Sequence, residues 1–160
     1  MSQSERAEGR RYELKQVIMS DLKNSTRLIE LLDQADTDED PQDLIVPAWV
    51  ARRWFDDDGP IRPPEVLLMV SFVSSSSERD NMIEESTYST QIEIDFSARV
   101  AQSLRRGWID ELLDEVDAVM TRHSEAWIAD GKTGLTDEPQ WNTDRNRYMT
   151  VERYDIIRRT

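Results

Sequence analysis

The sequence has 160 residues, enough for one domain with a real hydrophobic core. Its 33 acidic and 20 basic residues leave a net charge of −13, which argues against sequence-independent binding to nucleic acid or anionic membranes, because Lys and Arg must neutralise phosphates there. It contains no cysteine, so disulfides, thiolate metal sites and cysteine nucleophiles are excluded.

The basic residues are unevenly divided between the two types. Only Lys15, Lys23 and Lys132 are lysines, and the other seventeen are arginines. Arginine and carboxylates hold water and partners differently from the point charge of lysine. An acidic surface poor in lysine is typical of a halophilic cytoplasm, and ordinary acidity gives the same composition.

The sequence predicts neither an N-terminal export signal nor a membrane span. Residues 1–11 are small and charged, which predicts a flexible tail rather than a signal peptide. No stretch approaches the roughly eighteen apolar residues of a membrane span. We therefore expect a soluble protein that is not exported by that route.

The first regular element is a broken helix. Apolar residues at the three-four spacing predict a helix over 12–23, which Asn24 and Ser25 interrupt. Either residue can cap a second helical segment. The apolar positions are Leu14, Val17, Ile18 and Leu22, then Leu28, Ile29, Leu31 and Leu32. We expect this bent helix to pack on a sheet.

Residues 33–64 lose the periodicity. An acidic run before Pro41 and the cluster Asp56–Asp58 before further prolines cannot lie inside regular structure, because proline lacks an amide donor and fixes φ. The apolar island between them contains Trp49 and Trp54 and is either a short helix or a docked loop. The aspartates lack the ligand spacing of a calcium loop, so a solvated turn is favoured over a metal site.

Two strands follow, separated by a polar stretch. Residues 65–73 are apolar on both faces, as in a buried strand, and residues 87–97 alternate between apolar and polar. Such neighbours should pair antiparallel. The linker, 74–86, is too long for a tight hairpin and predicts a projecting arm or loop. Candidate subunit or partner contacts are Arg79, Met82, Ile83, Trp49 and Trp54. Simple disorder remains the alternative for the arm.

A long helix and a closing strand complete the pattern. Ser97 can cap a helix over 97–120 whose apolar stripe should cover the sheet. His123 follows it, and a dipole contact is favoured over catalysis or zinc binding. Residues 124–147 are polar and turn-rich, with Trp127 and Trp141 as isolated anchors. Residues 148–157 predict a closing strand, for which a position at a sheet edge is one option.

The order helix, strand, strand, helix, strand predicts an α+β domain spanning 1–160, an antiparallel sheet with two main helices packed on one face. The sequence contains no phosphate loop, nucleophile elbow or two-histidine motif. We therefore predict no catalytic residues, no cofactor and no metal.

The arrangement of these segments resembles a known family. The broken helix VIMSDLKNSTRLIELL, the entry RPPEVLLMVSFV, a polar arm, the strand and helix YSTQIEIDFSARVAQSLRRGWIDELLDEV, and the strand RNRYMTVERYDII resemble tail terminator and tail-completion proteins, which join heads to tails in long-tailed viruses. The likeness spans residues 12–158 and rests on element order. The 33–64 segment is longer than in the smaller members.

This resemblance implies a virion structural protein in the tail or neck, assembled in the host cytoplasm without a membrane. Its partners would be five further copies in a homo-hexameric ring, the tail tube protein and head–tail connector proteins. Genomic DNA would pass through the lumen without specific binding, which a negative lumen favours. The acidic composition would suggest a haloarchaeal host. The ring would stop tube growth and join tail to head.

Other classes stay open at this stage. A head-closure or connector ring would carry the same features, and so would a small acidic regulatory or adaptor protein. An enzyme is the weakest alternative, because no acid, base and nucleophile can be grouped from these residues.

Salt dependence tests the halophilic interpretation. Added salt shortens the reach of charge repulsion from ~10 Å at 0.1 M to ~3 Å at 1 M. The melting temperature, measured by calorimetry, should therefore rise as the salt concentration increases from tenths molar to molar. A melting temperature that stays flat over that range would contradict the interpretation.

Overall fold

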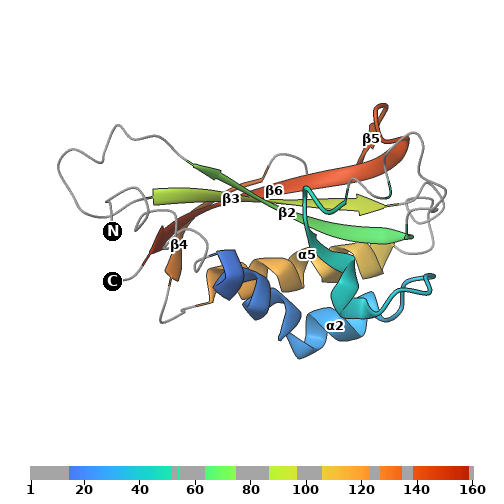
Figure 1. The fold of residues 1–160 in the computed structure, drawn as a ribbon, viewed down its shortest axis with the longest axis horizontal. Coiled ribbons are helices and arrows are strands. Elements are labelled where there is room, and N and C mark those ends of the chain that lie inside the picture. The colour runs from blue at the N-terminus through green and yellow to red at the C-terminus, as the bar shows by residue number, and fades with distance from the viewer. Residues whose placement is uncertain are drawn as a thin grey trace.

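The computed structural model describes residues 15–51, 54, 64–74, 87–96, 106–122, 127–134 and 139–158. A six-stranded sheet in the order β1-β2-β3-β6-β4, with β5 also paired to β6, forms one layer. The strands are β1 (Ile45–Pro47), β2 (Val66–Ser74), β3 (Thr87–Phe96), β4 (Trp127–Gly134), β5 (Gln140–Asn142) and β6 (Arg147–Arg158). A helix over 15–23, α2 (Thr26–Leu32), η1 (Pro41–Leu44) and α5 (Arg106–Thr121) lie together on one side of it (Figure 1).

The α+β class follows from these elements, and the pairing of β2 with β3 confirms the predicted antiparallel neighbours. Their register places Leu68 opposite Ile94, and both side chains are fully buried. Strand β2 reaches Ser74, the residue at which the arm was expected to begin. Residues 75–86, with Arg79, Met82 and Ile83, lie outside the described part of the chain.

The expectation of a purely antiparallel sheet is wrong at one edge. Strand β1 runs parallel to β2, with Ile45 opposite Leu68. It lies in the apolar island that was predicted to be a short helix or a docked loop. Three residues are too few to show a period, so only the neighbouring strand defines this segment as β structure.

The polar region 124–147 also contains two strands that the sequence did not predict. Strand β4 pairs with β6 and carries a bulge between Ala129 and Gly131. Glycine, aspartate and lysine are depleted in strands, so this sequence resembles a loop. Trp127 and Trp141, expected as isolated anchors, lie in β4 and β5. The rings of Trp141 and Tyr148 pack in a T-shaped arrangement with their centroids 5.1 Å apart.

Strand β6 is central rather than at an edge. It pairs with β3 on one side and with β4 and β5 on the other. Its face toward α5 carries Thr150, Glu152, Tyr154 and Ile156, all buried. Burial of the polar members depends on partners supplied by other elements, so the sequence of the strand alone does not predict it.

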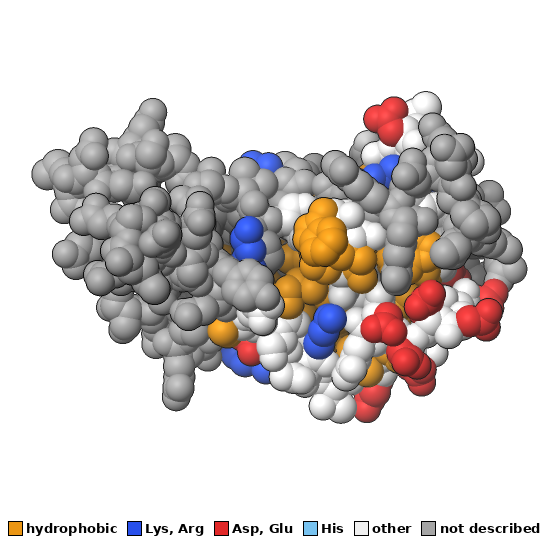
Figure 2. All heavy atoms as spheres, viewed as in Figure 1, with side chains coloured by type: hydrophobic (Ala, Val, Ile, Leu, Met, Phe, Trp, Pro, Cys, Tyr) orange, Lys and Arg blue, Asp and Glu red, His pale blue; other side chains and the backbone are white. Residues whose placement is uncertain are grey.

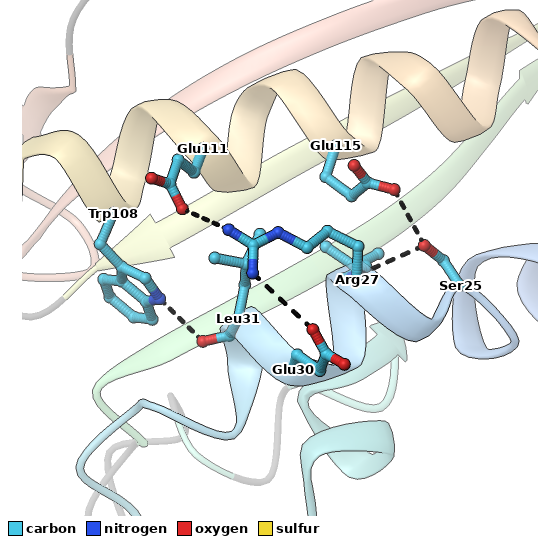
Figure 3. A network of polar contacts seen from close by, with 8 residues as sticks. Ser25, Arg27, Glu30, Leu31, Trp108, Glu111 and Glu115 are labelled. Atoms are coloured by element: carbon cyan, nitrogen blue, oxygen red, sulfur yellow. Dashed lines mark hydrogen bonds and ion pairs between the residues drawn. The ribbon is translucent and has the colours of Figure 1, made fainter.

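The break between the first two helices is a true cap. Ser25 Oγ accepts a hydrogen bond from the amide of Leu28 at 3.3 Å, as expected of an N-cap. The same hydroxyl donates to Glu115 of α5 at 3.2 Å (Figure 3). One serine thus starts α2 and ties it to α5.

Two further contacts align α2 with α5. The Trp108 indole Nε1 donates to the carbonyl oxygen of Leu31 at 2.7 Å, satisfying a carbonyl in the last turn of α2 (Figure 3). The Arg27 guanidinium meets Glu111 at 2.8 Å, but both side chains are about half-exposed. Exposed pairs contribute at most about 1 kcal/mol, so the buried indole bond and the apolar stripe fix the packing.

The stripe on α5 agrees with the prediction over the described part of the helix. Its members Trp108, Leu112, Val116, Val119 and Met120 are buried, together with Ile109. Residues 97–105 and His123 lie outside the described residues. Ile18 and Leu22 of the first helix join the same core.

A polar cluster lies under α5. The fully buried Tyr154 phenol donates to Glu152 Oε2 at 2.5 Å and lies 3.3 Å from Asp117 Oδ1. Burial raises the pKa of Tyr154 far above its ordinary value, and the two carboxylates raise that pKa further. The phenol therefore stays protonated in the folded chain where it would ionise in the unfolded one.

This difference predicts a specific loss of stability in alkali. Above pH ~10 the unfolded chain releases the Tyr154 proton and the folded chain keeps it, so the free energy of unfolding falls by up to about 1.4 kcal/mol per pH unit. The Tyr154→Phe variant lacks this term, so its deficit relative to the parent should shrink from about pH 9 to pH 11 in urea unfolding.

Tyr148→Phe is the matched control, because it removes a half-buried phenol outside the carboxylate cluster. A Tyr154→Phe deficit that stays constant across this pH range, after correction with the control, would contradict the assignment.

Candidate partner-binding groove

A groove of about 910 Å³ opens between the helix over 15–23 and the segment that runs from η1 through β1 to Trp49. Strand β2 contributes Val70 and Ser71 beside it. The helix lines it with Lys15, Gln16, Met19, Ser20 and Lys23, followed by Asn24, and the opposite segment with Gln42, Pro47, Ala48 and Trp49. The groove thus joins residues more than fifty positions apart.

Trp49 is the most conspicuous of the lining residues, because its side chain is 74% exposed. Its backbone is held by the β1 turn, in which the Ala48 amide donates to Val70 at 3.1 Å and the Val50 amide to Pro47 at 2.9 Å. A large apolar ring is thereby presented to water from a fixed backbone. Tryptophan in this setting is typical of residues that contribute most to protein–protein binding.

The charge of the groove differs from that of the whole chain. Lys15 and Lys23, two of the three lysines, line it, and no carboxylate does so among the described residues. The segment from α2 to η1, by contrast, is acidic, with Asp33, Asp36, Asp38, Glu39, Asp40 and Asp43. On the face seen in Figure 2, hydrophobic side chains gather in the middle, with cations beside them and acidic side chains toward one end.

The predicted contact residues separate into three groups. Trp49 is exposed at the groove, where a partner could reach it. Trp54 is 4% exposed and belongs to the hydrophobic core, so the folded chain does not offer its ring to a partner as it offers that of Trp49. The rest of the domain buries Trp54, and the sequence alone could not distinguish this tryptophan from Trp49 as a candidate contact. Arg79, Met82 and Ile83 lie outside the described residues.

Sequence reasoning missed the groove itself. Lys15, Met19 and Lys23 recur every four residues and therefore share one side of the helix. This spacing, with the scarcity of lysine, was a usable signal for a cationic surface. The contribution of β1 and β2 could not be found in the same way, because it depends on their parallel pairing.

The chemistry available in the groove is that of binding. Its described lining offers two ammonium groups, amide and hydroxyl groups, and apolar surface, without a carboxylate, histidine or cysteine. Across the described segments, no three His, Cys, Asp or Glu residues are grouped as metal ligands would be. Asp56–Asp58, the metal alternative, fall outside those segments. No described helix is both long and apolar enough to cross a membrane.

Comparisons with protein-family models, curated proteins and solved structures found no match to this chain.

Truncation of two tryptophans that lie five residues apart should change the stability of the fold by very different amounts. Trp54→Ala removes a buried ring and should lower the free energy of unfolding by about 3–5 kcal/mol. Trp49→Ala removes an exposed ring and should change it by no more than about 0.5 kcal/mol. Urea unfolding of both variants measures this directly. A Trp49→Ala loss as large as that of Trp54→Ala would mean that Trp49 is part of the core.

Proposed function

We propose that this chain is a virion structural protein, a tail terminator that forms a homo-hexameric ring at the head-proximal end of the tail tube of a long-tailed virus. The ring stops tube growth and joins the tail to the head connector proteins. The role is structural rather than enzymatic. The ring is assembled in the host cytoplasm and needs no membrane.

The observation that supports this proposal is that a groove and an open sheet edge lie at the two ends of the described sheet. The groove lies at the β1 side, where Pro47 and Val70 line it. At the other side, β4 pairs only with β6 among the described strands. An unpaired strand edge is a template for another chain. Contacts between unlike surfaces are heterologous, and they generate rings when the rotation between copies closes.

The order of elements supports the same class. Strands β2 and β3, helix α5 and strand β6 follow one another as in the resemblance to tail terminator proteins. Strand β4 is an addition between α5 and β6, and it supplies the sheet edge that a ring contact would use. The family resemblance and the edge geometry therefore support one assembly.

The net charge suits a protein that surrounds a DNA conduit. A chain of charge −13 repels the phosphate backbone, so six copies present no general affinity for DNA that passes through their lumen. Passage without specific binding is what a ring in the neck requires. The same acidity is compatible with a haloarchaeal host.

Deletion of the gene in the virus that encodes this chain tests the proposal. Without a terminator, tube growth has no stop, so electron microscopy should show tails of uncontrolled length beside DNA-filled, tailless heads. Supplying the parent chain from a plasmid should restore a single tail length and joined particles.

The alternatives give different images. Tails of normal length that fail to join heads would replace the terminator with a head-closure or connector ring. Normal virions would contradict both roles and favour a regulatory or adaptor protein.

A further inference from the structure

The groove combines features that specify what it can hold. Trp49, Met19 and Pro47 supply apolar surface, and Lys15 and Lys23 supply two positive charges eight residues apart on one helix. A complementary ligand therefore has a short apolar anchor with carboxylates beside it. Because the chain as a whole is strongly acidic, a surface with two lysines and no lining carboxylate among the described residues would attract a second copy rather than repel it.

The chain carries a segment of that chemistry between β2 and β3. Residues 75–86 read SSSERDNMIEES, in which Met82 and Ile83 are followed directly by Glu84 and Glu85. The apolar pair matches the exposed ring and its neighbours. The two carboxylates match the two lysines in number and sign.

The two points at which this segment joins the sheet limit how far it can extend. It leaves the sheet after Ser74 and returns at Thr87, and Ser74 is paired with Tyr88, so both ends start from one point. Six residues from either end span up to about 20 Å when extended. A chain of this length is long enough to extend past the last β2–β3 pair, Ser74 and Tyr88.

We propose that the groove between the helix over 15–23 and Trp49 binds residues 79–86 of a second copy of this chain. Met82 and Ile83 cover Trp49, and Glu84 and Glu85 face Lys15 and Lys23. The proposal rests on the ring, which supplies the second copy, and it assigns the groove to a segment of the neighbour rather than to the neighbour's β4 edge. Each molecule then donates one segment and accepts another, so this contact is heterologous as well.

Paired charge reversals test the contact in the full-length chain. The Lys15→Glu/Lys23→Glu variant has an acidic groove and an acidic segment, and the Glu84→Lys/Glu85→Lys variant has a basic groove and a basic segment. Each alone should associate about tenfold more weakly than the parent in analytical ultracentrifugation. An equimolar mixture should recover parental association, because each groove then meets a segment of opposite charge on the other variant.

The mixture distinguishes a contact between copies from a contact within one chain. Arg122→Glu, an exposed reversal at the end of α5, is the control and should associate like the parent. Equal melting temperatures for all variants establish that folding is intact. Recovery only in a single chain that carries all four reversals, and not in the mixture, would overturn the proposal, as would parental association by either variant alone.

A peptide experiment separates this inference from the proposed function. A synthetic peptide of residues 75–86 added to the parent chain should shift the fluorescence of Trp49, and the shift should be lost in Trp49→Phe and in Lys15→Glu/Lys23→Glu. Peptide binding without any ring in the virion would contradict the terminator role and retain the groove contact. No peptide binding, with virion rings intact, would overturn the groove contact and leave the terminator role standing.

Discussion

The rest of the structure depends on the first part of strand β2, which is buried on both of its faces over Val66–Val70. Every residue from Val66 to Val70 is buried, so side chains on both faces of the strand must be covered. Strand β1 occupies one edge and β3 the other. The core helices lie over one face, and on the part of the chain that is described, Arg145 of the β5–β6 turn contacts Met69 at 3.3 Å.

The residues at the start of β2 are also held in place by hydrogen bonds. The buried guanidinium of Arg147 donates from Nη2 to the carbonyl oxygens of Pro64 and Glu65, at 2.6 and 2.8 Å. The Glu65 carboxylate accepts from the amide of Asp36. Three distant parts of the chain therefore meet where β2 begins. Because β1 pairs with this immobilised strand, the turn after β1 is held as well, and it presents Trp49 at the groove.

The sequence was sufficient wherever the signal is local. The apolar run of β2, the alternation of β3, the stripe of α5 and the Ser25 cap all depend on residues close together, and each was predicted. Strand β1 is too short for a period, and β4 contains residues that disfavour strands. The central place of β6 depends on Glu152 and Tyr154 being buried together, which requires α5 above them.

The candidate site shows the same division. Trp49 and Trp54 are equivalent in sequence, and only the folded core separates the exposed ring from the buried one. The lysine spacing on the first helix could be read in advance, but its meeting with β1 and β2 could not. Long-range pairing creates the groove, so no local pattern predicts its outline.

We propose that copies of this chain form a closed ring at the head-proximal end of a viral tail. Cryo-electron microscopy of the neck of the intact virion tests it most directly. The account predicts a ring of six copies at the end of the tail tube, with the sheet and α5 recognisable in each and the Trp49 groove occupied at every contact. A neck built without this chain, or this chain found in another part of the particle, would contradict it.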